Sequence, residues 1–96
     1  MPTFPVRIFK VAARSMEPAI KQGSYAIACT WSRRLKPGDR IVLRHPKRDI
    51  AIIKRVKTVD EKSVYVVGDN AEESEDSRKF GPVSMENVIG KVIFVA

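Results

Sequence analysis

Short runs of apolar and β-branched residues recur along this chain, and polar turns separate them. Several turns carry residues that tight turns favour, such as Pro37-Gly38-Asp39 and Asp60-Glu61-Lys62. No segment of any length shows the 3.6-residue periodicity of an amphipathic helix. The sequence therefore predicts an all-β fold, either a coiled antiparallel sheet or a partly open barrel. The predicted strands cover residues 4–11, 25–31, 40–44, 50–59, 63–67 and 88–95.

The length and charge of the chain limit the classes of protein to which it can belong. At 96 residues, with no linker or internal repeat, we expect a single domain over residues 1–96. The net charge of +7 would attract phosphate groups or anionic lipid surfaces. The basic residues are dispersed, however, and no recognition helix, zinc pattern or interleaved aromatic set accompanies them. We therefore expect a solvated basic surface and no specific nucleic-acid partner.

Metal, disulfide and membrane signals are missing from the sequence. A single cysteine, Cys29, excludes an intramolecular disulfide, and a single histidine, His45, leaves no ligand set for a metal. His45 stands beside Pro46 in a charged turn, where we expect it to be exposed. No apolar run approaches the roughly 18–20 residues that span a bilayer, and the first residues lack the regions of a secretory signal. We therefore expect a soluble, cytoplasmic protein with no cofactor and no membrane span.

One lysine interrupts the apolar run at the start of the longest predicted strand. Side chains alternate along a strand, so Ile50, Ile52, Lys54 and Val56 share one face, the expected core side. Burial disfavours the ammonium and lowers its pKa, and a neutral amine is a competent general base for a serine hydroxyl. Strand alternation alone leaves a second interpretation open, in which the side chain of Lys54 extends to the sheet edge and keeps its charge in water.

Three stretches of the sequence, taken in order, carry a family resemblance. They are Arg14-Ser15-Met16-Glu17-Pro18, the lysine strand at 50–56, and the acidic loop at 68–81. The loop contains Gly68-Asp69-Asn70 and, further on, Ser74-Glu75-Asp76-Ser77-Arg78. Together they resemble the catalytic boxes of type I signal peptidases, serine proteases that use a Ser/Lys pair, over residues 13–92. The resemblance implies the same all-β architecture. Signal peptidases proper carry a membrane anchor before the serine box, and here the box begins after a dozen residues, so we expect a bare catalytic core.

The resemblance also implies roles for individual residues. Ser15 would be the nucleophile and Lys54 its general base. No Ser/His/Asp triad is available, because the one histidine lies in an unrelated turn. Ser77 would hydrogen-bond the Lys54 amine and orient it. Asp76 would pair with Arg55 or Arg78 and hold the loop, whose Gly68 and Gly81 fit turn positions with unusual dihedral angles.

The residues around the nucleophile are expected to bind substrate. Met16, Pro18 and Ala13 are the predicted substrate-binding residues, and the Ser15 backbone amide is the predicted oxyanion donor. Family members often carry Ser or Gly two positions before the nucleophile, and a Ser there can donate its hydroxyl. Here that position is Ala13, so the sequence does not identify a second oxyanion donor.

These features predict a serine endopeptidase that cleaves a leader or propeptide through an acyl-enzyme, with its substrate bound as an extended strand. Among anchorless members, the chain is most similar to peptidases proposed to mature nickel-dependent superoxide dismutase. Three alternatives are a self-cleaving domain like those of SOS-response repressors, a catalytically silent peptide-binding β module, and a nucleic-acid-binding β-barrel. The barrel would need aromatic side chains gathered on one face, and here they are few and dispersed.

Overall fold

The computed structural model describes residues 5–31 and 34–96. Within these residues, strands dominate and the helical elements are a single turn each, so the all-β prediction is confirmed. The elements are, in chain order, β1 (Val6–Lys10), β2 (Tyr25–Cys29), β3 (Arg40–Arg44), β4 (Ala51–Val59), β5 (Ser63–Val67), the 3₁₀ turn η1 (Ala71–Glu73), α1 (Ser77–Phe80), β6 (Val83–Ser84), the 3₁₀ turn η2 (Met85–Asn87) and β7 (Val88–Val95).

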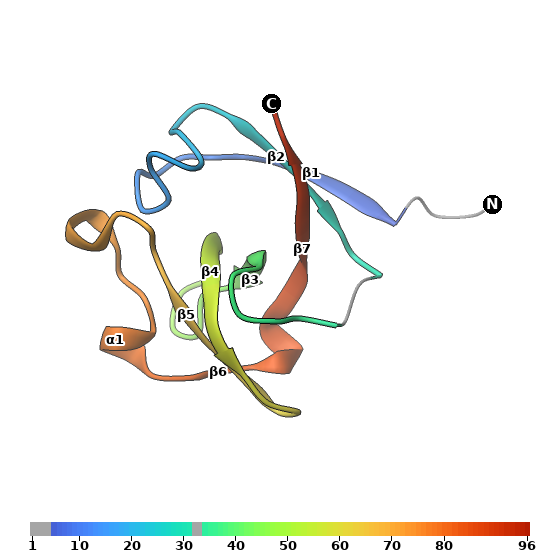
Figure 1. Cartoon of the computed structure of the whole chain (residues 1–96), viewed down its shortest axis with the longest axis vertical. Helices are drawn as coiled ribbons and strands as arrows, with labels where there is room; N and C mark the ends of the chain where they lie inside the picture. Colours follow the sequence, from blue (N-terminus) through green and yellow to red (C-terminus); the bar gives the residue numbers. More distant parts are fainter. Residues whose placement is uncertain (1–4, 32–33) are drawn as a thin grey trace.

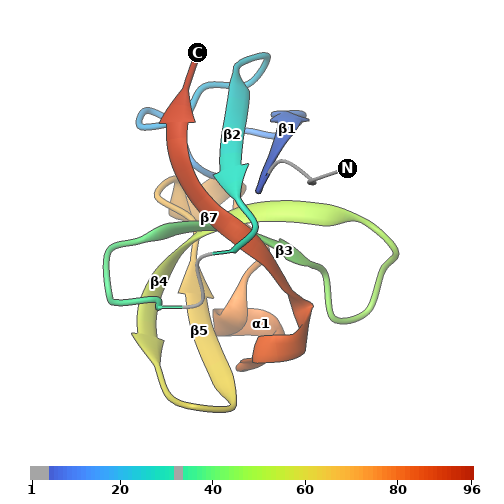
Figure 2. The same cartoon turned by 90° about the vertical axis from the view of Figure 1, so that its right-hand side faces the viewer.

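The seven strands form one sheet in the order β1-β2-β7-β3-β4-β5-β6, and every neighbouring pair is antiparallel. The last strand, β7, lies between β2 and β3 and joins the N-terminal hairpin to the other strands (Figure 2). The pairing register shifts at 27/28, 42/43 and 56/58. Such irregularities bend a strand and increase its twist. The sheet consequently curls into a half-barrel (Figure 1), which confirms the predicted coiled sheet.

The curled sheet encloses two hydrophobic clusters, and β3 contributes to both. Val42 packs in the first cluster with residues of β2, β7 and the segment after β1. Its neighbours Ile41 and Leu43 point to the opposite face and pack in the second cluster with β5, β6 and part of β4. A strand buried on both faces reads as a continuous apolar run, which is the pattern of β3.

Three strands, β3, β5 and β7, coincide with the predicted ranges, and the others differ at their ends. Strand β2 ends at Cys29, and β4 begins at Ala51 because Ile50 closes the preceding turn through a hydrogen bond from the His45 N–H to its carbonyl. Strand β1 begins at Val6, and the predicted start at Phe4 lies outside the described residues. The 3₁₀ turn η2 follows the short strand β6 and leads into β7.

The strand edges that remain available for pairing within the described residues include those of β1 and of the first half of β4. Strand β1 pairs only with β2. Strand β4 pairs with β3 over Ala51–Arg55 but with β5 only from Arg55 onward, so its first half has one neighbouring strand. In the part of the chain that the structure describes, no helix is long and apolar enough to cross a membrane.

Candidate active site

Ser15 lies in a turn that follows β1. Buried apolar residues of the same turn hold it in place. Met16 and Ile20 are fully buried in the first hydrophobic cluster. The turn is closed by backbone hydrogen bonds from the Ile20 N–H to the Met16 carbonyl (2.8 Å) and from the Glu17 N–H to the Arg14 carbonyl (3.1 Å). Ser15 is itself 8% exposed. Apolar packing of Met16 therefore fixes the backbone beside the predicted nucleophile.

Lys54 is buried in β4, as strand alternation predicts. It is 4% exposed, Val56 on the same face is buried, and Lys57 on the opposite face is exposed. The interpretation that its amine reaches water at the sheet edge is therefore wrong. Burial lowers the pKa of Lys54 below its ordinary value, and the nearby positive charge of Arg78 acts in the same direction. Asp76 and, more weakly, Glu75 oppose this shift through their negative charges.

Ser15 and Lys54 line the same cavity, which has a volume of about 490 Å³. The cavity lies between the end of β1, with the segment that follows it, and the first half of β4. Ala13 and Met16, two of the predicted substrate-binding residues, also line it, whereas Pro18 is exposed and does not. Among the described residues, no hydrogen bond joins the Ser15 hydroxyl to the Lys54 amine, which donates elsewhere.

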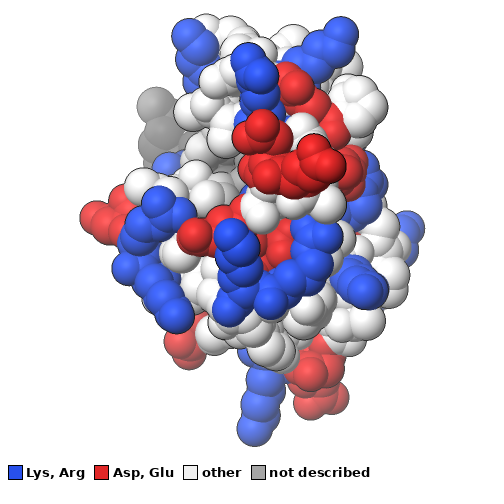
Figure 3. Space-filling model, turned by 90° about the vertical axis from the view of Figure 1, so that its left-hand side faces the viewer, with Lys and Arg blue, Asp and Glu red and all other residues white. Residues whose placement is uncertain are grey.

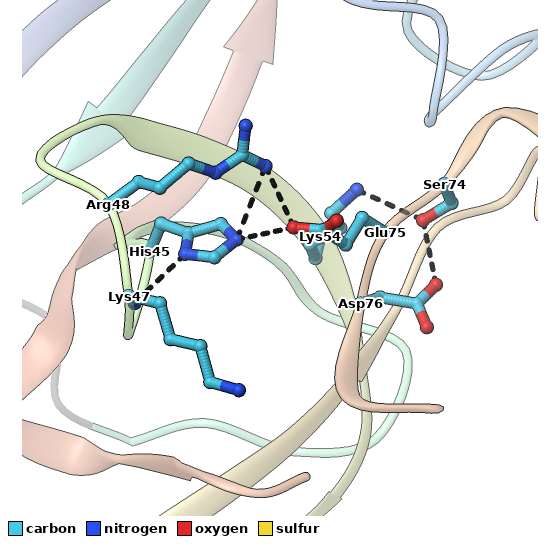
Figure 4. Close-up of polar contacts among 7 residues, drawn as sticks. All are labelled: His45, Lys47, Arg48, Lys54, Ser74, Glu75 and Asp76. Carbon is cyan, nitrogen blue, oxygen red and sulfur yellow. Dashed lines mark hydrogen bonds and ion pairs between the residues drawn. The ribbon is translucent and has the colours of Figure 1, made fainter. Parts of the chain in front are cut away.

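The Lys54 amine donates a hydrogen bond to Ser74 Oγ (3.0 Å), and Ser74 in turn donates to Asp76 Oδ2 (2.7 Å) (Figure 4). Asp76 is 1% exposed and also accepts hydrogen bonds from the Gly68 N–H and from Arg78. Burial would raise the pKa of Asp76, but the hydrogen bonds from Arg78, Gly68 and Ser74 outweigh it and hold this pKa well below its usual range. The carboxylate is therefore charged and fully hydrogen-bonded inside the loop.

The serine that contacts Lys54 is Ser74, so the prediction that Ser77 makes this contact is wrong. The Ser77 hydroxyl instead accepts a hydrogen bond from the backbone N–H of Val66 in β5 (2.9 Å). Asp76 caps α1, which begins at Ser77, and the change from extended to helical backbone turns the Ser77 side chain toward β5. Residues 74–76 precede α1 and are extended, so Ser74 and Asp76 lie on one side of the segment. This alternation is the sequence signal that could have identified Ser74 as the partner of Lys54.

Arg55 and Arg78, the two predicted alternatives for pairing with Asp76, have different partners in the structure. Arg78 pairs with Asp76. Arg55 does not pair with Asp76; its guanidinium makes two 2.8 Å hydrogen bonds to the carboxylate of Asp69 and a third, of 2.7 Å, to the Gly38 carbonyl. Asp69 lies two residues after Val67, the β5 residue that pairs with Arg55, so it is close to Arg55 along the sheet. This pair ties the start of the loop to β4.

Gly68 is required by a close approach between chain segments, and the prediction of an unusual dihedral angle there is wrong. A Cβ atom at Gly68 would lie 2.2 Å from Ser74 Oγ and 2.7 Å from the Ser15 carbonyl oxygen. The N–H of Asn70, two residues further along, donates to that same carbonyl (2.7 Å), so the loop and the Ser15 turn lie side by side (Figure 1). Gly81 does adopt the predicted left-handed conformation, with φ of 78°.

His45 is buried, and the prediction that it is exposed is wrong. Its ring is enclosed by an edge contact with Phe80, with centroids 5.0 Å apart, and it lines the same cavity as Ser15. Its Nδ1 accepts a hydrogen bond from the Lys47 N–H (3.0 Å), and its Nε2 lies 2.8 Å from Glu75 Oε1. The neighbouring proline marked a turn correctly, but the partners come from a loop 30 residues away, which the local sequence does not reveal.

Comparison with known proteins identifies the family. The family model described as signal peptidase, peptidase S26, matches residues 1–59 and 56–96. The chain belongs to this family. It is also 30% identical, over 115 aligned positions, to the mitochondrial inner membrane protease subunit 2 of Schizosaccharomyces pombe (strain 972 / ATCC 24843). The alignment covers 94% of this chain and 64% of that relative, so the chain spans a little under two thirds of the relative's length.

The surface on the side of the loop carries acidic side chains gathered in a band, with Lys and Arg side chains around it (Figure 3). Within residues 5–31 and 34–96, no group of three or more His, Cys, Asp and Glu side chains could hold a metal ion.

Proposed function

We propose that this protein is a serine endopeptidase whose nucleophile is Ser15 and whose general base is Lys54. The observation that carries the proposal is the burial of both residues against one cavity, with a desolvated amine held by Ser74. A serine hydroxyl is a weak nucleophile unless a base removes its proton, and a lysine becomes such a base when burial favours its neutral form. His45 and Glu75 line the same cavity, but they are hydrogen-bonded to each other.

The proposed reaction has two steps. Ser15 Oγ attacks the carbonyl carbon of the scissile bond, and the neutral Lys54 amine takes the hydroxyl proton. The resulting ammonium returns that proton to the leaving amine as the carbon–nitrogen bond breaks, which leaves an ester between Ser15 and the acyl half of the substrate. Water then attacks the ester, with Lys54 again removing a proton and returning it to Ser15. The Ser15 backbone N–H, which makes no hydrogen bond to another described residue, would donate to the oxyanion.

We propose that the substrate binds as an extended strand along the first half of β4. This edge carries unpaired backbone groups between Ala51 and Lys54, and it forms one wall of the cavity. The end of β1 forms the opposite wall and has a free outer edge. A peptide placed between them would add its backbone to the sheet, which is a recurring mode of peptide recognition.

The substrate class that we propose is a leader or propeptide with small residues before the cleaved bond. The relative from Schizosaccharomyces pombe is described as a protease of the mitochondrial inner membrane. The finer prediction, removal of the N-terminal extension of a nickel-dependent superoxide dismutase, would be tested by incubating that precursor with the protein. The self-cleaving repressor domain stays an alternative that cleavage of a separate peptide would contradict.

Peptide cleavage with a covalent intermediate tests the proposal directly. The wild-type protein should cut a peptide that carries small residues before one bond. Mass spectrometry of the acid-quenched reaction should find the acyl half attached to the tryptic fragment that contains Ser15. A protein that binds such peptides, and neither cleaves them nor becomes acylated, would instead be the silent peptide-binding module.

The two serines of the loop should have separable effects. Ser74→Ala removes the hydrogen-bond acceptor of the Lys54 amine, and we expect kcat to fall by up to about tenfold with KM little changed, since one hydrogen bond between neutral groups contributes about 0.5–1.5 kcal/mol. Ser77→Ala removes a contact with β5 and should lower thermal stability with a smaller effect on kcat. Steady-state kinetics and thermal melts of both variants give kcat and the melting temperature. A larger loss of kcat in Ser77→Ala than in Ser74→Ala would mean that Ser77 orients the Lys54 amine.

A further inference from the structure

The carboxylate of Glu75 joins the loop at 68–81 to the connection between β3 and β4. Its Oε1 lies 2.8 Å from His45 Nε2 and 2.7 Å from Arg48 Nη2, and both partners belong to that connection (Figure 4). We call these three residues the Glu75 cluster. In the sequence, Glu75 lies between Ser74 and Asp76. Ser74 contacts Lys54, and Asp76 contacts Ser74. The cluster therefore holds the loop at the position where it meets the lysine.

The imidazole of His45 is fixed on several sides. Because Nδ1 accepts from the Lys47 N–H, the neutral ring carries its proton on Nε2 and donates it to Glu75. The ring is 5% exposed and meets the edge of Phe80, the last residue of α1. Burial and these contacts leave His45 a single orientation. It is therefore a rigid donor, whereas the Arg48 side chain is 58% exposed.

The other anchors of the loop do not fix Ser74 in the same way. The hydrogen-bond partners of the Asp76 carboxylate, apart from Ser74, are Gly68 and Arg78, so these bonds shape the loop internally. Asp69 ties the start of the loop to β4, and Ser77 ties α1 to β5. Glu75 is bonded to the chain segment that leads directly into β4, the strand that carries Lys54.

We propose that the Glu75 cluster is a positioning group that sets Ser74 against the Lys54 amine and thereby controls the activity of the base. The inference rests on the proposed function of Lys54, and it assigns a role to His45, a buried residue that the proposed reaction does not use. Without the cluster, the centre of the loop would be free to move from the β3–β4 connection, and Ser74 would leave the lysine. A displacement of about 1 Å at such a site can cost about 100-fold in rate.

A pair of substitutions at His45 separates positioning from packing. The amide nitrogen of a glutamine reaches the place of Nε2, so His45→Gln keeps the donor to Glu75, while His45→Asn is too short to do so. Neither changes the charges around Lys54, which are those of Asp76, Arg78 and Glu75. We expect His45→Asn to lower kcat about tenfold with KM little changed. His45→Gln should retain most of the wild-type kcat. Glu75→Ala should match His45→Asn, and Glu72→Ala, at an exposed position of the same loop, should match wild type.

A second measurement does not depend on turnover. The pKa of Lys54, followed by NMR of labelled lysine side chains, should fall further in His45→Asn, because the ammonium loses Ser74 as an acceptor, and should be unchanged in His45→Gln. If His45→Asn does not fold, the kcat of Glu75→Ala carries the test, since the Glu75 side chain is 46% exposed. The Lys54 pKa is compared only among the His45 variants, because the Glu75 charge itself raises that pKa. Wild-type kcat in His45→Asn and in Glu75→Ala, with a wild-type Lys54 pKa in His45→Asn, would overturn the inference. A shifted Lys54 pKa in a protein that never cleaves peptides would support the cluster and reject the peptidase.

Discussion

Replacing Lys54 by Met is expected to abolish peptide cleavage while leaving the sheet folded. Methionine keeps most of the length and apolar contacts of the side chain and removes only the amine. Because the proposed base is then missing, turnover should fall by about a thousandfold or more. The fold should not suffer: burial lowers the pKa of Lys54, so at neutral pH its ammonium is less favourable in the folded than in the unfolded state. The free energy of unfolding of Lys54→Met should thus equal or exceed that of wild type.

The controls for this result lie on the same strand and across the cavity. Lys57→Met removes an exposed lysine from β4 and should leave turnover unchanged. Ser15→Ala should be as inactive as Lys54→Met, and the double variant should be no worse than either, because the two residues act as one unit. Substantial cleavage by folded Lys54→Met would mean that another group removes the proton and that the Ser/Lys assignment is wrong.

The pH dependence of the wild-type rate follows from the same residue. Activity needs the neutral amine, so it should rise with pH as Lys54 loses its proton. Because burial lowers the pKa of this amine from its ordinary 10.5, the rising limb should lie below that of an exposed lysine. A rate that increases only near the ordinary lysine pKa would show that the amine is solvated in the active protein.

The strands could be predicted because their signals are local. Side-chain alternation along β4 placed Lys54 on the buried face, and the apolar run at 40–44 gave β3 its bounds. The boundaries that differ, as at Ile50, depend on hydrogen bonds that close turns. The division into two hydrophobic clusters was not predictable, because it arises when β3 packs against different elements on its two faces.

The site residues that belong to ordered sequence motifs could be predicted, whereas the contacts that depend on the conformation of the loop at 68–81 could not. Ser15 and Lys54 follow from three ordered motifs, and the structure brings both to one cavity. The choice between Ser74 and Ser77 depends on where α1 begins, which is set by the capping carboxylate of Asp76. The ring of His45 is covered by Glu75 and Phe80, which both belong to the loop at 68–81. Contacts of this kind join distant segments and leave no local pattern.

Asp76 should be the residue of the loop on which stability depends most. Its carboxylate is 1% exposed and accepts hydrogen bonds from the Gly68 N–H, the Ser74 hydroxyl and the Arg78 guanidinium. Asp76→Ala leaves buried donors without a partner, which should lower the free energy of unfolding by about 3 kcal/mol and the melting temperature by more than about 10 °C. Glu72→Ala, an exposed acid of the same loop, should change the melting temperature little. Equal effects of the two substitutions would make Asp76 an ordinary surface acid.

The pH dependence of this difference tests its cause. The hydrogen bonds hold the pKa of Asp76 below its ordinary value of 3.8, so the unfolded state binds the proton more readily. The stabilisation is therefore fully present above about pH 4 and is lost as pH falls toward the lower pKa of the folded state. Urea unfolding of wild type and Asp76→Ala should give curves that are far apart at neutral pH and converge below about pH 4. A gap that stays constant to low pH would mean that the loss comes from packing and that the charge of the carboxylate does not hold the loop.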